Sequence, residues 1–119
     1  MNSVILRGHL SSAPQARELA SGAVLWSLEI TTPTDEGAWS VPVAWFDPPA
    51  VPTFAVGDEV VVCGGVRRRF FRTSAGTQSR TEVVATEVVG ANAKRKVQRV
   101  VARAAERLGA AADGEVRSR

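Results

Sequence analysis

The stretch 67-RRRFFRTSAGTQSR-80 combines cationic side chains with flat aromatic rings. It holds five arginines and two adjacent phenylalanines in fourteen residues, and it contains no lysine. A guanidinium group pairs with a phosphate through two hydrogen bonds or stacks on a base, and an aromatic ring stacks on any base. The combination is typical of a surface that binds single-stranded nucleic acid.

The arginines of this stretch are the first candidates for phosphate contacts. Residues 1–91 carry seven arginines against nine acids, and five of the seven lie in the stretch. We expect Arg67, Arg69 and Arg72 to contact phosphates, because no acid stands close to them in the sequence. Phe70 and Phe71 point to opposite faces of a strand, so at least one of the two is expected to pack. The alternative is a solvated sheet edge that prevents aggregation, although lysine is the more usual residue there.

The rest of the chain lacks the groups that catalysis needs. His9 is the single histidine, Cys63 is the single cysteine, and no lysine precedes Lys94. Nucleophilic and metal-assisted mechanisms use such groups in sets, so we expect no enzymatic activity, no metal and no cofactor. Cys63 is predicted to be a small core side chain. The pair of glycines that follows it indicates a bulge or a close approach of two backbones.

The chain has 119 residues, which is enough for one compact domain. Its net charge of +3 is uneven, because residues 1–91 carry −2 and residues 92–119 carry +5. We therefore divide it into a domain at 1–91 and a basic tail at 92–119. The opening segment MNSVILRGHL lacks the features of a secretory signal, and no stretch has the length of a membrane span. We expect a cytoplasmic protein with no membrane partner.

Five blocks of β-branched and apolar residues predict five short strands. They span residues 3–10, 23–32, 39–46, 58–69 and 80–89. Alternation places Trp26 toward the core, and Phe46 is a further core candidate. Residues 31–38 are expected to form a short acidic loop, and the proline-rich segment 47–58 leaves room for about one helical turn. Five strands with a brief crossover after the third predict a Greek-key barrel of the OB type.

The tail predicts an amphipathic helix over residues 92–112. Asn92 is its expected cap, and Gly109 or Gly114 its expected end. An isolated helix of this length is marginal, so its apolar face needs the barrel, the same helix of another subunit or a different protein. That face consists of Val97, Val100, Val101, Ala104, Ala105 and Leu108. The opposite face, which we expect to point to solvent, carries Arg95, Arg99, Arg103 and Arg107.

Five segments of residues 1–90 carry a resemblance by their order and spacing. They are 2-NSVILRGHL-10, 14-PQARELASG-22, 39-WSVPVAWF-46, 57-GDEVVVCGGVRRRFF-71 and 80-RTEVVATEV-88. Together they resemble the bacterial-type single-stranded DNA-binding protein family. The resemblance implies an all-β OB-fold domain that assembles into dimers or tetramers and binds single-stranded DNA.

The resemblance also assigns roles to individual positions. Trp39 matches the tryptophan that opens the third strand of the family's barrel, and Trp45 matches the aromatic residue near that strand's end. Phe71 matches the aromatic residue of the long hairpin between strands four and five, and Arg67 and Arg69 match its basic positions. With two further arginines of the hairpin, the expected nucleic-acid-binding residues are Trp39, Trp45, Arg67, Arg69, Phe71, Arg72 and Arg80.

The chain departs from the family in three places. The loop 31–38 is short and lacks the further stacking tryptophan that the family usually has. Prolines interrupt the helix that the family usually places between strands three and four. The chain ends in 113-DGEVRSR-119 instead of an acidic, partner-recruiting tip. These departures favour a specialised paralogue, a phage or mobile-element version, or an accessory factor.

The sequence thus predicts a non-catalytic protein that coats single-stranded DNA with little sequence preference in replication, repair or recombination. Its expected partners are single-stranded DNA, further copies of itself, and a replication or recombination protein. Two alternatives stay open: an OB-fold assembly module that docks through the basic helix, or an RNA-binding accessory factor. A subunit of an enzyme is a third. The alternative for Trp39, Trp45 and Phe71 themselves is that they are ordinary residues of the barrel, since aromatic residues in strands usually belong to the core.

Overall fold

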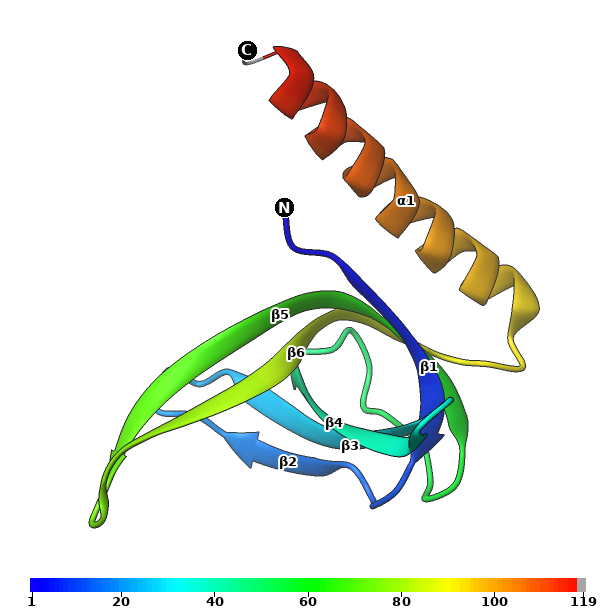
Figure 1. Cartoon of the computed structure of the whole chain (residues 1–119). Helices are drawn as coiled ribbons and strands as arrows, with labels where there is room; N and C mark the ends of the chain where they lie inside the picture. The colour runs from blue at the N-terminus through cyan, green and yellow to red at the C-terminus, as the bar shows by residue number, and fades with distance from the viewer. Residues whose placement is uncertain (118–119) are drawn as a thin grey trace.

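The chain folds into a small β-barrel followed by one helix (Figure 1). The computed structural model describes the backbone of residues 1–117 and the side chains of residues 1–110. Its elements are β1 (Val4–Leu10), β2 (Gln15–Glu18), β3 (Val24–Thr34), β4 (Gly37–Phe46), β5 (Glu59–Thr73), β6 (Gly76–Gly90) and α1 (Lys94–Arg117).

Five of the strands close the barrel. β1 pairs with β5, β5 with β6, β4 with β3, and β3 with β1, all antiparallel. The remaining contact, between β4 and β6, is parallel. The predicted five-stranded barrel of OB type with a C-terminal helix is therefore confirmed. Closure leaves no long unpaired edge among these five strands.

The short strand β2 lies outside the five predicted strands. It pairs with the beginning of β3, from Gln15 opposite Ser27 to Glu18 opposite Val24. β1 pairs with a later part of the same edge of β3, where Leu10 lies opposite Ile30. β2 therefore continues β1 along β3 after a break at residues 11–14. Its four side chains are all exposed, which explains why no apolar pattern marks it.

The two long hairpins end in the same four-residue turn, Thr-x-x-Gly. In each turn the threonine hydroxyl accepts a hydrogen bond from the second amide after it and donates one to the glycine carbonyl. Gly37 and Gly76 have φ values of 111° and 114°, which a residue with a side chain rarely adopts. The predicted loop at 31–38 is wrong for this reason, because β3 and β4 extend to a two-residue turn at Asp35 and Glu36.

The core fills the barrel with branched side chains from every wall. Leu10, Ile30, Val60 and Val62 are fully buried, and the partly buried Trp26 packs against their cluster, as expected. The long strands β5 and β6 bend through a bulge between Cys63 and the following glycine. A Cβ at Gly64 would overlap the backbone of Val84, which confirms the close approach of two backbones predicted there.

The helix α1 lies against the outer surface of β5 and β6 and then continues past the barrel (Figure 1). Val100 and Ala104 are buried against Val61 and Cys63, so the helix finds its partner in its own barrel. Val97 and Val101 pack at the margin of this contact, whereas Ala105 and Leu108 remain exposed.

The ends of the helix differ from those predicted. Lys94 is the first helical residue, and no hydrogen bond of the described residues joins the Asn92 side chain to the helix. The helix also runs through Gly109 and Gly114 to Arg117.

Within residues 1–117, no helix is both long and apolar enough to cross a membrane. The proline-rich segment 47–58 contains no helical turn.

Candidate nucleic-acid interface

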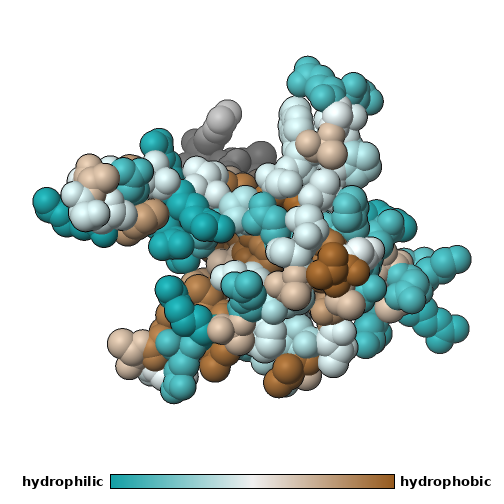
Figure 2. All heavy atoms as spheres, turned by 90° about the horizontal axis from the view of Figure 1, so that it is seen from below, coloured by the Kyte–Doolittle hydropathy of each residue, from teal (hydrophilic) through white to brown (hydrophobic). Residues whose placement is uncertain are grey.

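The hairpin of β5 and β6 presents two different faces, because it extends beyond the barrel and both faces meet solvent. Figure 2 shows it projecting at the left of the molecule. Cross-strand pairs define the faces: Arg67 lies opposite Glu82, Arg69 opposite Arg80, and Phe71 opposite Gln78. These residues share one face, which continues the outer surface of the barrel. Phe70, Arg68 and Arg72 occupy the other face.

A buried carboxylate organises the arginines of the first face. Glu82 is 5% exposed, and its oxygens accept hydrogen bonds from Arg67 at 3.0 Å and Arg69 at 3.1 Å. Arg80 forms a third ion pair with the same carboxylate at 3.6 Å. The expectation that no acid compensates the hairpin arginines is therefore wrong for Arg67 and Arg69. Three cations nevertheless share one anion, so the cluster keeps an excess of two positive charges.

The ion pairs affect the ionisation of Glu82. Burial raises the pKa of this carboxyl, but the hydrogen bonds from Arg69 and Arg67 outweigh burial, and the pKa lies below its ordinary value. Glu82 is therefore an anion at neutral pH. It orients the three guanidinium groups while leaving each arginine side chain between 41% and 48% exposed.

Each of three neighbouring arginines also stacks on an aromatic ring. The guanidinium carbon of Arg67 lies 5.2 Å from the ring centre of Phe46, and that of Arg69 lies 5.3 Å from the ring centre of Phe71. Phe46 is therefore not the core residue predicted for it but lies half-buried on the outer surface. Phe46 and Trp45 are neighbours on one strand and point to opposite faces, so the structure reverses both predictions together: Trp45 lies inside and Phe46 outside.

The other face of the hairpin repeats the pairing of an arginine with a phenylalanine. The guanidinium carbon of Arg68 lies 5.2 Å from the ring centre of Phe70, and its Nη2 donates to the hydroxyl of Ser79 at 3.1 Å. Phe70 is 66% exposed and Phe71 is 38% exposed, so neither ring is buried. The expectation that one of the two packs in the core is wrong. Arg68 and Phe70, which were not among the predicted contacts, are therefore further candidates.

A groove runs beside the first face of the hairpin. Its volume is about 380 Å³, and it separates the hairpin from β2 and the beginning of β3. Arg69, Arg80 and Glu82 form one wall, and Arg17 and Ser27 belong to the other. We call it the hairpin groove. Three arginines and one carboxylate line it, so the groove is polar and positively charged.

The remaining predicted site residues are distributed over the molecule. Trp39 lies on the hairpin of β3 and β4, opposite Thr32, and is 56% exposed because that hairpin extends beyond the core. Arg72 is exposed near the tip of the β5–β6 hairpin and forms no ion pair within residues 1–110. The structure thus brings Arg67, Arg69, Phe71 and Arg80 together and places Trp39 on a different hairpin.

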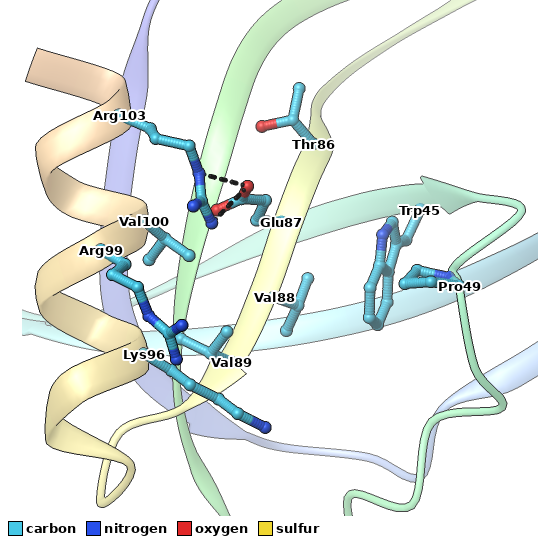
Figure 3. Close-up of a pocket in the computed structure, with 10 residues that line it drawn as sticks. All are labelled: Trp45, Pro49, Thr86, Glu87, Val88, Val89, Lys96, Arg99, Val100 and Arg103. Carbon is cyan, nitrogen blue, oxygen red and sulfur yellow. Dashed lines mark hydrogen bonds and ion pairs between the residues drawn. The ribbon is translucent and has the colours of Figure 1, made fainter. Parts of the chain in front are cut away.

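Trp45 is not part of this exposed surface. It is 8% exposed and belongs to the buried core cluster, because alternation along β4 turns it inward with Val43. A ring in this position cannot stack on a base in the hairpin groove, so Trp45 does not belong to that part of the interface. One edge of the ring reaches a second pocket, between the barrel and α1 (Figure 3).

The helical arginines do not all point to solvent as expected. Arg103 donates to Glu87 of β6, with its Nε at 2.9 Å and its Nη2 at 2.8 Å from Oε1. The hydrogen bond to Glu87 raises the pKa of Arg103. Arg99 lines the pocket between helix and barrel, together with Lys96 (Figure 3). The expected solvent-facing stripe is therefore wrong for Arg103, which is bound to the barrel, whereas Arg99 is exposed as expected and also borders the pocket.

No protein-family model matches the sequence, and no curated protein matches it either.

Proposed function

We propose that the protein binds single-stranded DNA without catalysis and with little sequence preference, through the β5–β6 hairpin and the hairpin groove. The observation that supports this most directly is the cluster around Glu82. Three half-exposed arginines are held in fixed positions by one carboxylate and retain a net positive charge. Such a cluster attracts phosphates and needs little rearrangement to bind them.

The aromatic rings on the hairpin supply the second requirement. Single strands expose the faces of their bases, and stacking on a ring contributes about 1–3 kcal/mol per base regardless of base identity. Phe70 and Phe71 offer one ring on each face of the hairpin, and each is already accompanied by an arginine. A base in a duplex is covered by its neighbours, so these rings favour single strands.

The shape of the interface supports the same reading. The hairpin groove has polar walls and a volume of about 380 Å³, which suits an extended chain of phosphates and sugars better than an apolar ligand. Trp39, on the β3–β4 hairpin, would offer a stacking platform to a strand that continues beyond the groove. The OB-type barrel is itself a common scaffold for such binding.

We further propose a relationship to the bacterial-type single-stranded DNA-binding proteins, on the sequence segments described above. Assembly into a dimer or tetramer, action in replication, repair or recombination, and a cytoplasmic location belong to this proposal. Measuring the mass by light scattering, with and without an oligonucleotide, tests the assembly.

A binding titration tests the proposed function. The anisotropy of a labelled thymidine oligomer should rise as protein is added, and a duplex of the same length should bind more weakly. An RNA oligomer of equivalent sequence, titrated in parallel, compares the two kinds of strand. Equal affinity for duplex and single strand, or no binding of either, would contradict the proposal.

A further inference from the structure

A second pocket lies between α1 and the barrel, away from the hairpin groove. Its volume is about 320 Å³, at the lower end of the range typical of small-molecule sites. In Figure 3 the side chains of α1 reach toward it from one side, and Trp45 and Pro49 face it from the other. We call it the helix pocket.

The helix pocket has an apolar floor. Trp45, Pro49 and Val88 line the barrel side of the pocket, and Val100 lines the helix side. Trp45 is 8% exposed, so an edge of the indole forms part of the wall while the rest of the ring packs in the core. A flat apolar group of a ligand would gain contact here without displacing any polar partner.

Three cations stand at the rim against one acid. Arg103 is committed to Glu87, at 2.8 Å. Among residues 1–110, neither the Lys96 side chain nor the Arg99 side chain forms a hydrogen bond or an ion pair. Both side chains extend from the helix toward the pocket in Figure 3. The rim therefore has two cations available for an anionic group.

One buried polar atom has no partner. Glu87 binds Arg103 through Oε1, while its Oε2 is shielded from solvent and accepts no hydrogen bond. Buried acceptors are normally paired, and an unpaired one costs free energy. No water-sized group reaches Oε2 in this arrangement, so a ligand in the helix pocket does not contact it unless the Glu87 side chain turns.

We infer that the helix pocket binds one nucleotide of a strand, with the base on the apolar floor and the phosphate between Lys96 and Arg99. A nucleotide combines the two features that the pocket requires: a flat base for the apolar floor and an anionic phosphate for the two available cations. This inference rests on the proposed function, because it assumes that the ligand belongs to a nucleic-acid strand.

The geometry separates this site from the hairpin groove. The helix pocket is lined by α1, the end of β6, Trp45 of β4 and Pro49 after it, whereas the groove is lined by β2, β3 and the β5–β6 hairpin. Strand β4 contributes to both, since Val43 and Ala44 also line the groove. No residue lines both. A strand bound in the groove would have to continue around the barrel to place a nucleotide under the helix.

The test uses thymidine 5′-monophosphate as the probe and amide chemical shifts of the full chain as the readout. The mononucleotide should shift the amides of Val88, Val89 and Val100 and the indole N–H of Trp45. Thymidine without phosphate and inorganic phosphate without a base should each bind more weakly. Equal affinity for thymidine and its monophosphate would overturn the inference, as would shifts confined to the hairpin groove.

Matched helix variants give the second part of the test. Arg99→Gln should weaken mononucleotide binding by about tenfold or more, since it removes a charged hydrogen-bond donor. Arg95→Gln lies one turn earlier, does not line the pocket, and should leave the affinity unchanged. Equal effects of the two variants would overturn the inference.

A third variant separates this inference from the proposed function. Arg69→Gln removes an arginine of the hairpin groove, so it should weaken oligonucleotide binding and leave mononucleotide binding in the helix pocket intact. If the wild-type protein binds no oligonucleotide, the proposed function fails. The mononucleotide shifts then still decide whether the helix pocket binds a nucleotide. Loss of the mononucleotide shifts in Arg69→Gln would show that the mononucleotide binds in the groove and would overturn the inference.

Discussion

Glu82 is the residue on which the arrangement of the hairpin arginines depends. Its buried carboxylate holds Arg67, Arg69 and Arg80 in place, yet it also cancels part of the charge that attracts phosphates. Moving the arginines to a phosphate would leave this buried carboxylate without its partners, which costs free energy. Glu82 therefore positions the cationic groups, and in the proposed function it would also compete with phosphates for them.

Replacing Glu82 by glutamine should strengthen the binding of single strands. The amide keeps the shape and a hydrogen-bond acceptor but removes the competing charge. The slope of log affinity against log salt concentration should become steeper by about 0.7 for each further phosphate that the freed arginines neutralise. Anisotropy titrations at several salt concentrations measure both quantities.

Glu59→Gln is the matched control for this substitution. Glu59 also pairs with an arginine, Arg7, at 2.7 Å, but both side chains are exposed and neither lines the hairpin groove. The control should leave affinity and slope unchanged. Unaltered or weaker binding by a folded Glu82→Gln protein would show that the cluster has no part in binding.

The same carboxylate should make stability depend on pH. The pKa of Glu82 in the folded chain lies below the ordinary value of 4.5, so its contribution to the free energy of unfolding is complete above that pH. The contribution is lost as the pH falls through the folded pKa, because protonation ends the ion pairs. Urea denaturation between neutral and acid pH should show a loss in wild type that is smaller in Glu82→Gln. Parallel pH profiles for the two proteins would contradict this.

Exposed and buried aromatic residues should respond differently to truncation. Phe71→Ala and Trp39→Ala should each weaken oligonucleotide binding by about 1–3 kcal/mol, with little change in thermal midpoint, because both rings are exposed. Trp45→Ala should instead lower the free energy of unfolding by about 3–5 kcal/mol, because it opens a cavity in the core. Thermal melts of the three variants measure the loss of stability, and oligonucleotide titrations measure the loss of binding. A large stability loss in Trp39→Ala without a specific binding defect would contradict the assignment of Trp39.

At the scale of elements, the helix and the barrel meet through a small apolar contact. Cys63 is fully buried there, and its thiol points to the carbonyl oxygen of Val100 at 3.8 Å. Burial is the largest cause of the raised pKa of this thiol, and the nearby Glu87 adds to it. The thiol should therefore react slowly while the helix is docked.

Cys63 thus reports on helix docking. Val100→Asp places a charge in the contact, so it should detach the helix and speed the reaction of Cys63 with a thiol reagent several-fold, while circular dichroism still shows the barrel. Ala105→Asp introduces the same charge at an exposed helical position and is the control. Equal labelling rates in the two variants would show that the helix does not protect the thiol.

The β5–β6 hairpin shows what the sequence could and could not predict. Blocks of valine identified the strands, and the concentration of arginine and phenylalanine identified the hairpin as a candidate surface. The register of β5 against β6 could be predicted only after the turn between them had been located. Once Ser74 and Ala75 form the two-residue turn, Arg67 falls opposite Glu82. Without that turn, the acid fifteen residues after Arg67 appeared too distant to pair with it.

The other differences between the predicted and the observed elements have separate causes. The Thr-x-x-Gly sequence at Thr34 repeats that at Thr73, and this repetition could have replaced the predicted loop by a hairpin. By contrast, β2 pairs through its backbone while its side chains are exposed, so no hydrophobic pattern could reveal it. The position of the helix also depends on contacts distant in sequence, such as Arg103 with Glu87.

At the scale of the whole molecule, positive charge is placed in two separate regions. Residues 1–91 carry a net charge of −2, yet their hairpin holds an excess of cations, and the tail adds +5. The hairpin groove and the helix pocket lie on different parts of the barrel surface. A strand that contacts both would have to wrap the domain, and a strand that contacts only the hairpin would need far fewer nucleotides.

The salt dependence of binding to a thymidine oligomer tests the central claim most directly, because the claim is that fixed arginines neutralise the phosphates of a single strand. If about three to five phosphates are neutralised, the slope of log affinity against log salt concentration should lie between about −2 and −3.5. Titrations of the full chain at four or more salt concentrations give this slope. A flat response, or no binding at low salt, would contradict the account.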